Sequence, residues 1–146
     1  MNLNKYYGLI LGLAAIGLLL SGYLSYWNLF GPGCHEGPLS WLVSCGGPQK
    51  VLIFGLPTCV YGFAMYLTVA TLAVIGMMRQ RSDVLNGIRL LGVVGTLFAA
   101  GLTIYELWIL KIQFSGLPAC VYGLVLYAGI LVTSHVAHRQ LRRAAA

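Results

Sequence analysis

The chain has 146 residues, of which 59% are hydrophobic and only 8% are charged, and its formal net charge is +6. A soluble domain carries about 25% charged residues, so this composition excludes an ordinary soluble protein. The positive charge is not arranged as a basic stripe with interleaved aromatic residues, which nucleic-acid binding would require. The composition therefore predicts an integral membrane protein that has the lipid bilayer, and no nucleic acid, as a partner.

Four apolar segments are long enough to cross a bilayer, which takes about 20 residues of helix. Short connections between successive spans favour an up-down-up-down arrangement. The sequence therefore predicts an all-α integral membrane protein, a four-helix transmembrane bundle that forms a single domain over residues 1–146. The predicted helices cover about residues 6–30, 57–78, 88–110 and 118–135.

The longest connection, residues 31–50, joins the first predicted helix to the second. It is rich in glycine and proline, which predicts a loop. Its middle, residues 38–44, is apolar enough to form a short amphipathic helix at the membrane surface. A loop of this length in a compact bundle is more typical of a functional segment than of a simple connector. It carries two of the four cysteines, Cys34 and Cys45.

The basic residues are distributed unevenly between the two sides of this topology. An even number of spans puts both chain ends on one side, and the positive-inside rule places the side richer in Lys and Arg in the cytoplasm. We therefore expect a multi-pass protein of the bacterial cytoplasmic (inner) membrane, with both termini cytoplasmic and residues 31–50 outside. Seven of the nine basic residues lie on the side of the chain ends, namely Lys5, Arg79, Arg81, Arg89, Arg139, Arg142 and Arg143, while Lys50 and Lys111 lie opposite.

The second and fourth predicted helices begin with nearly the same octapeptide. Residues 55–62 read GLPTCVYG and residues 116–123 read GLPACVYG. Each copy opens a long apolar run at a proline, which suits the first turn of a helix. The repeat therefore places Cys59 and Cys120 at the same depth, on two helices that run in the same direction.

All four cysteines are expected on the outer, oxidising side, where disulfides persist. Four cysteines allow three pairings. The repeat favours Cys59 with Cys120, because a glycine follows each of them by three residues and permits the α-carbon separation of about 5.5–6 Å that a disulfide needs. Cys34 and Cys45 would form the second pair.

Two cysteine pairs at different heights favour a relay by thiol–disulfide exchange, from a protein outside the membrane to a molecule in the lipid. Purely structural disulfides are less favoured, because the bilayer already confines the helices. A small cysteine-dependent heavy-metal carrier is an alternative, but it needs soft ligands along a path across the membrane. The inner half of the chain offers only Met77 and Met78, and we expect no metal site.

Glu106 is the one acidic residue inside a predicted span, near its outer end. Carboxylates within a membrane are costly and are often functional. At this shallow depth the side chain could equally reach water or pair with Lys111. The sequence leaves a functional and a structural role for Glu106 open.

These features together resemble the vitamin K epoxide reductase family of membrane thiol oxidoreductases, which is related to the bacterial disulfide-generating quinone reductases. The resemblance covers nearly the whole chain. It rests on four helices, an outer loop with the spaced cysteines Cys34 and Cys45, a Phe54-Gly55-x-Pro57 start to the second helix, and Cys120 at the start of the last helix.

The resemblance implies that Cys34 and Cys45 exchange disulfides with an extracytoplasmic thioredoxin-like protein. It also implies that Cys120 faces a quinone, menaquinone or ubiquinone, bound between the helix ends. Thr58 falls where the family usually carries an asparagine that hydrogen-bonds the quinone, and a threonine hydroxyl could do the same. The aromatic candidates to line the ring pocket are Trp41, Phe54, Tyr61, Phe114 and Tyr122.

The chain departs from the family pattern at the last helix. The family carries Cys-x-x-Cys there, and the first of those positions is Leu117 in this chain. We infer that Cys59, where the family normally has no cysteine, replaces it as the resolving partner of Cys120. Electrons would then pass from Cys34 and Cys45 to Cys59 and Cys120 and on to a quinone. The alternative is a non-catalytic relative that kept the fold.

Overall fold

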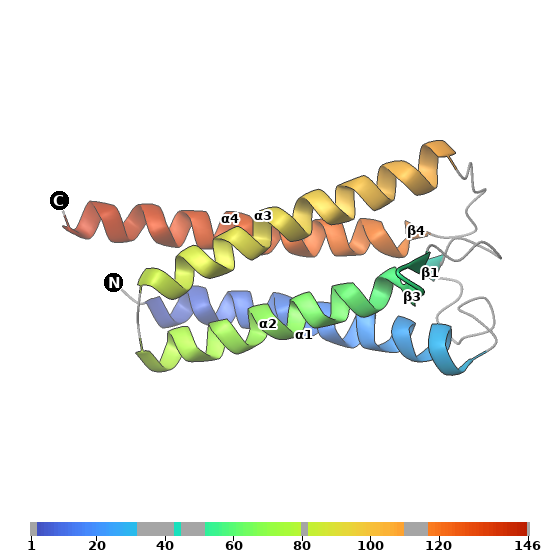
Figure 1. The fold of residues 1–146 in the computed structure, drawn as a ribbon. Helices are drawn as coiled ribbons and strands as arrows, with labels where there is room; N and C mark the ends of the chain where they lie inside the picture. The colour runs from blue at the N-terminus through green and yellow to red at the C-terminus, as the bar shows by residue number, and fades with distance from the viewer. Residues whose placement is uncertain (1–2, 32–42, 45–51, 80–81, 110–116, 146) are drawn as a thin grey trace.

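The computed structural model describes residues 3–31, 43–44, 52–79, 82–109 and 117–145 (Figure 1). Within these residues the chain is built almost entirely of helix, and four helices are long and apolar enough to cross a membrane. The predicted all-α membrane bundle is therefore confirmed. The helices are α1 (Leu3–Phe30), α2 (Thr58–Arg79), α3 (Ser82–Ile104) and α4 (Ala119–Ala145), and a π-helical turn, η2 (Tyr105–Ile109), continues α3.

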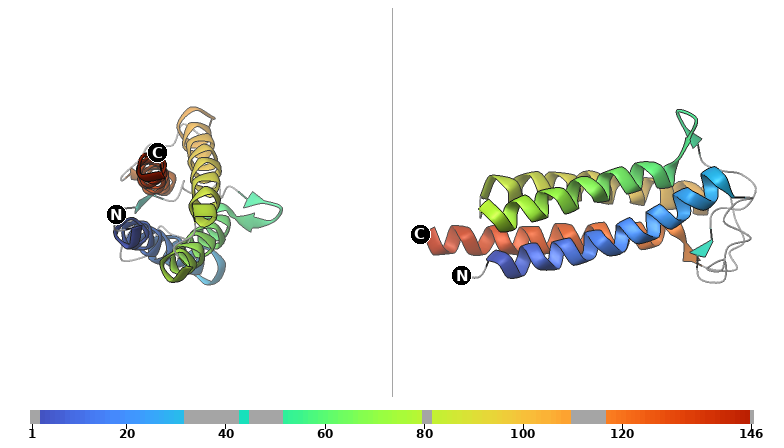
Figure 2. Two further views of the ribbon diagram at one scale, coloured as in Figure 1. Left: turned by 90° about the vertical axis from the view of Figure 1, so that its left-hand side faces the viewer. Right: turned by 90° about the horizontal axis from the view of Figure 1, so that it is seen from below.

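The four helices form two antiparallel hairpins. Helix α1 packs most extensively against α2, and α3 packs most extensively against α4. The hairpins meet through further contacts of α1 with α4 and of α2 with α3. Figure 1 shows both termini at the same end of the bundle, and the end-on view in Figure 2 shows the four helices around a common centre. An even number of spans and short connections between them produce this arrangement, as the sequence predicts.

The structure assigns longer helices than the apolar segments alone indicate. Helix α3 begins at Ser82, whereas the predicted third helix begins at residue 88. Helix α4 extends to Ala145, whereas the predicted fourth helix ends at residue 135. Hydropathy marks the part of a helix that crosses the bilayer, and a polar helix end can continue into water beyond it. Large apolar side chains such as Leu19, Leu97 and Met78 are exposed around the bundle, as expected for a surface that faces lipid.

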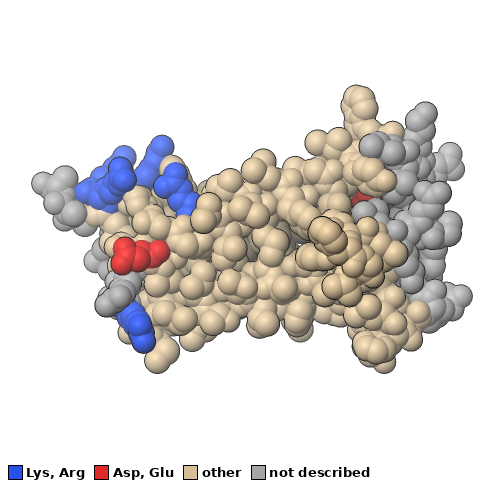
Figure 3. Space-filling view, in the orientation of Figure 1, with Lys and Arg blue, Asp and Glu red and all other residues tan. Residues whose placement is uncertain are grey.

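Charged residues mark one end of the bundle. Figure 3 shows the Lys and Arg residues of the described segments gathered at the end that holds both chain termini. The middle of the molecule carries no Lys or Arg on the face shown. This distribution agrees with the charge asymmetry that the sequence predicts between the two sides.

A close contact between a glycine and a tyrosine ring sets the helix spacing in each hairpin. A methyl group added at Gly17 of α1 would overlap the ring of Tyr66 on α2, and one added at Gly95 of α3 would overlap the ring of Tyr127 on α4. Small residues permit this close approach of membrane helices. The α1–α2 hairpin has a second such contact, between Gly76 of α2 and the ring of Tyr7 on α1. A tyrosine that follows a repeat therefore packs over a glycine of the neighbouring helix in both halves of the molecule.

Within the described residues, four short strands lie at the end opposite the termini: β1 (Val43–Ser44), β2 (Leu52–Ile53), β3 (Leu56–Pro57) and β4 (Leu117–Pro118). Strand β1 pairs in parallel with β4, with Ser44 opposite Pro118. This pairing holds part of the loop between α1 and α2 against the start of α4. Of the short helix expected over residues 38–44, the two described residues form a strand instead, and the others lie outside the described residues.

Strands β2 and β3 form a hairpin just before α2. Leu52 pairs with Pro57 and Ile53 with Leu56, so the turn consists of Phe54 and Gly55. Both turn residues have positive φ, 50° and 80°, which is typical of the two-residue turns that match the twist of a hairpin. Figure 2 shows this hairpin projecting sideways from the bundle.

Candidate functional site

A pocket lies among the four helices in the half of the bundle opposite the termini. Its walls are almost entirely apolar, and its empty volume is about 540 Å³ including its open side. Each helix contributes to it: Leu24 from α1, Cys59 from α2, Phe98 from α3 and Cys120 from α4. An apolar pocket with a few polar groups is the usual form of a small-molecule site.

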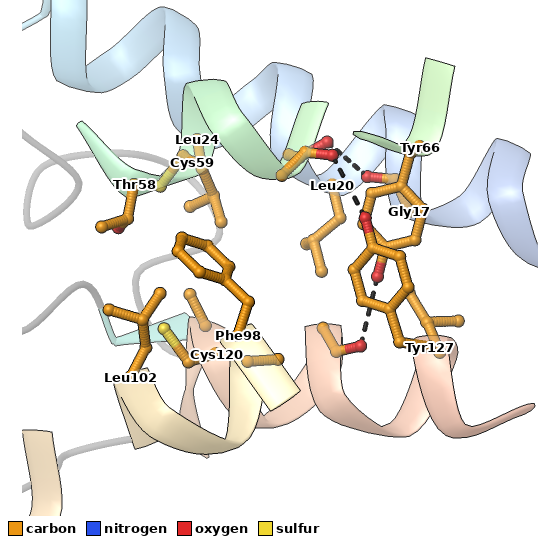
Figure 4. A pocket seen from close by; sticks show the side chains of 16 residues that line it. Gly17, Leu20, Leu24, Thr58, Cys59, Tyr66, Phe98, Leu102, Cys120 and Tyr127 are labelled. Carbon is orange, nitrogen blue, oxygen red and sulfur yellow. Dashed lines mark hydrogen bonds between the residues drawn. The ribbon is translucent and has the colours of Figure 1, made fainter. Parts of the chain in front are cut away.

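The inner end of the pocket is formed by Tyr66 and Tyr127. Their rings are stacked with centroids 4.3 Å apart and planes 14° apart. The Tyr66 hydroxyl donates to the Gly123 carbonyl at 3.2 Å, and the Tyr127 hydroxyl donates to the Gly62 carbonyl at 3.5 Å. The tyrosine that follows each repeat therefore donates a hydrogen bond to the other repeat, which joins α2 to α4 directly (Figure 4).

Cys59 and Cys120 lie in the first turns of α2 and α4, and both line this pocket. Each lies seven residues before the tyrosine of its own helix, which is about 10 Å along a helix axis. Both are free thiols and both are partly buried. In Figure 4 they stand on opposite sides of the pocket, and the ring of Phe98 points into the space between them. The structure thus brings the two repeated cysteines to one site.

The two thiols have different polar neighbours. The side-chain amide of Asn28 on α1 donates to Cys59 Sγ at 3.8 Å. Cys120 Sγ donates to Glu106 Oε1 at 3.5 Å. Cys59 therefore lies beside a neutral hydrogen-bond donor, whereas Cys120 lies beside a group that can accept a proton.

Glu106 is buried, with only 7% of its surface exposed. It belongs to η2, the π-helical turn that follows the C-terminal end of α3, and single π turns are frequent at functional sites. The structural interpretation in which the carboxyl reaches water disagrees with this burial. Lys111, the ion-pair partner considered from the sequence, lies outside the described residues.

The remaining predicted site residues fall in different places. Thr58 lines the pocket beside Cys59. Tyr61 does not line it, and its hydroxyl donates to the Ile53 carbonyl at 2.8 Å, which ties α2 to the β2–β3 hairpin. Phe54 is 97% exposed in the hairpin turn, and Tyr122 packs against Leu24 outside the pocket lining. The predicted residues outside the described segments are Cys34, Trp41, Cys45 and Phe114.

Some pocket residues have no distinctive signal in the sequence. Phe98 and Leu102 line the pocket from α3, but in the sequence they are two apolar residues among many in a membrane span. Tyr66 and Tyr127 recur at the same offset in the two repeats, and that recurrence is the one sequence signal that marks them. In the described part of the chain, no cluster of three or more His, Cys, Asp or Glu side chains could hold a metal ion.

Two thiols that line one pocket can alternate between a dithiol and a disulfide, which is the chemistry of thiol oxidoreductases. The family model described as "Vitamin K epoxide reductase family" matches residues 8–113, which is more than half of the chain. The chain therefore belongs to the vitamin K epoxide reductase family, and the resemblance inferred from its sequence is confirmed. No curated protein and no solved structure matches the chain.

Membership of this family indicates a membrane oxidoreductase that acts by thiol–disulfide chemistry, with quinone-type substrates in general. The family match ends before β4 and α4. Cys120 and the second repeat therefore lie beyond the matched residues.

Proposed function

We propose that this protein is a quinone-dependent disulfide oxidoreductase in which Cys59 and Cys120 are the pair that reacts with the quinone. The observation that carries the proposal is that both thiols line one apolar pocket between the outer ends of the helices. A redox pair that the family usually holds within the last helix is here divided between α2 and α4. The repeat that starts both helices supplies the two equivalent positions.

The pocket suits a quinone chemically. Its apolar walls match a ring with a lipid tail, and Thr58 provides a hydroxyl that can donate a hydrogen bond to a quinone carbonyl. The stacked pair of Tyr66 and Tyr127 limits how deeply the ring can enter. Menaquinone and ubiquinone both satisfy these requirements.

In one turnover, the S–H bonds of Cys59 and Cys120 break and one S–S bond forms between the two sulfurs. The quinone takes up two electrons and two protons and becomes a hydroquinone. Reduction of the new disulfide by Cys34 and Cys45 returns the pocket to its dithiol state. The electrons come from a reduced thioredoxin-like protein on the outer side, which leaves with a disulfide of its own.

The pairing of β1 with β4 supports this transfer. Ser44, the residue before Cys45 in the sequence, pairs with Pro118, two residues before Cys120. The chain segment that leads to a loop cysteine is thus anchored beside the start of α4. We propose that the loop lies outside the bacterial cytoplasmic membrane and that both termini lie in the cytoplasm, because the basic residues of the described segments gather at the terminal end.

The test is quinone reduction by purified, pre-reduced protein in detergent, followed by the change in quinone absorbance. Wild-type protein should reduce the quinone, whereas Cys59→Ser and Cys120→Ser should each fall to the background rate, because neither can form the disulfide. Thr71→Ala is the control, since Thr71 is exposed on α2 and does not line the pocket. Full activity of Cys59→Ser would contradict the divided pair, and an inactive wild type would favour a non-catalytic relative.

A further inference from the structure

We propose that Glu106 is the catalytic base for Cys120: it accepts the thiol proton when Cys120 transfers electrons to the quinone. This inference rests on the proposed function, because it assigns a role within the same reaction. It concerns a residue for which the sequence leaves a functional and a structural interpretation equally open.

The contact between the two side chains is direct. Cys120 Sγ donates to Glu106 Oε1 at 3.5 Å, so the proton already lies on the line along which it would move. A general base must lie within hydrogen-bond reach of the proton that it takes, and a sulfur donor has a longer reach than oxygen or nitrogen. The geometry therefore fits proton transfer without rearrangement of either helix.

The rest of the carboxyl group has no competing partner in the described part of the chain. Oε2 of Glu106 is buried and makes no hydrogen bond with any described residue. Buried polar atoms are normally hydrogen-bonded, and one without a partner calls for an explanation such as a catalytic role. A carboxyl kept only for stability would be expected to have both oxygens satisfied.

Glu106 reaches this place because it continues the buried face of α3. Successive members of that face are separated by three or four residues, which is the spacing of one side of a helix. The face consists of Leu85, Ile88, Gly92, Gly95, Ala99 and Thr103, and the next residue at this spacing is Glu106. The side chain therefore points toward α4, with its carboxyl group at Cys120.

The two cysteines are not equivalent with respect to this base. Cys59 receives a hydrogen bond from the Asn28 amide, which can donate a proton in a hydrogen bond but cannot take one up from a thiol. Only Cys120 donates to a carboxyl oxygen among the contacts of the described residues. Cys120 is thus the thiol whose proton has a local acceptor, and Cys59 is its resolving partner.

Glu106 takes the proton of Cys120 on Oε1, and the Cys120 sulfur, now a thiolate, supplies electrons for the reaction that ends in the Cys59–Cys120 disulfide. The protonated carboxyl then loses this proton to the outer aqueous phase. Cys59 loses its own thiol proton to the same phase. The reduced quinone takes up two protons from the same phase, so the carboxylate is restored after each turnover.

The test compares Glu106→Gln with wild type in the quinone-reduction assay, with kcat and KM measured separately. Glutamine keeps the size and a hydrogen-bond acceptor but cannot take up a proton. We expect kcat to fall by about 10²- to 10⁴-fold, the usual contribution of a general base, while KM stays within about twofold. Asp83→Asn is the matched control, because it removes a carboxylate at the opposite end of α3 and should leave kcat unchanged.

A Glu106→Gln variant that folds and retains the wild-type kcat would overturn the assignment. Glu106→Asp covers the case in which glutamine prevents folding, because it keeps a carboxylate but draws it back by one methylene. We then expect a folded protein with a reduced kcat, and an Asp variant as fast as wild type would contradict a base that must lie within hydrogen-bond reach of Cys120. If wild type itself fails to reduce quinone while the purified protein is folded, the proposed function fails first, and the role of Glu106 fails with it.

Discussion

The two hairpins of this protein, α1 with α2 and α3 with α4, use the same octapeptide to build the same frame. In each, a cysteine lies in the first turn after the repeated proline, and a tyrosine seven residues later packs over a glycine of the neighbouring helix. The two tyrosines then stack and donate hydrogen bonds across to the opposite repeat. The repeat thus supplies a nearly symmetric pocket with one thiol on each side.

The helices that do not carry the repeat make the two sides chemically different. From α1, Asn28 donates to Cys59 through an amide, and at the end of α3, Glu106 accepts from Cys120 through a carboxyl oxygen. The repeat also differs at one position, where Thr58 has a hydroxyl and Ala119 has none. The repeated helices α2 and α4 therefore position the thiols, while α1 and α3 determine what each thiol can do.

The largest effect on the shared frame is expected from filling its close contacts. Gly17→Ala and Gly95→Ala each place a methyl group where a tyrosine ring lies, so each should destabilise the protein by about 1–3 kcal/mol, as overpacking does. Gly101→Ala is the control, because nothing lies within 4 Å of its added methyl group. Thermal unfolding in detergent measures the stability of all three variants. A lowered stability of only one of Gly17→Ala and Gly95→Ala would contradict an equivalent role of the two contacts.

A smaller effect is expected from removing the crossed hydrogen bonds. Tyr66→Phe and Tyr127→Phe keep the stacked rings and each lose one bond, which is worth about 0.5–1.5 kcal/mol. Tyr66→Phe should have the larger effect, because its bond is shorter, 3.2 Å against 3.5 Å. Tyr26→Phe, on an exposed ring of α1, should leave the unfolding temperature unchanged. Equal stability of all three variants would contradict a structural role for the crossed bonds.

The smallest effect is expected from making the two repeats identical. Thr58→Ala removes the hydroxyl that we propose as a donor to the quinone, so KM for quinone should rise by about two- to fivefold with little change in kcat, as expected for one neutral hydrogen bond. Adding a hydroxyl on the other side, in the double variant Thr58→Ala with Ala119→Thr, should not restore KM. Restoration would mean that either side of the pocket can orient the ring.

Much of the fold follows directly from the sequence. Hydropathy gives the four spans, and the repeat identifies the starts of α2 and α4 and the two cysteines that the structure brings to one pocket. Helix ends are harder to predict from the sequence, because the polar ends of α3 and α4 stay helical outside the apolar stretches. The strand at Val43 and Ser44 depends on pairing with β4, a contact between distant parts of the chain that local composition does not encode.

The site was harder to predict than the fold. Aromatic residues near the start of α2 looked alike in the sequence, yet Tyr61 holds the β2–β3 hairpin and Phe54 is exposed in its turn. Phe98 lines the pocket without any local signal. The burial of Glu106, by contrast, could have been found by extending the small-residue face of α3 through Gly95 and Ala99 to the end of the helix.

The divided redox pair is the central claim, and disulfide mapping tests it most directly. Pre-reduced protein is mixed with one equivalent of quinone, its remaining thiols are blocked, and the peptides of a non-reducing digest are identified by mass spectrometry. The account predicts a peptide in which Cys59 is linked to Cys120, formed together with one hydroquinone per protein. Quinone reduction with both cysteines recovered as blocked thiols would contradict it.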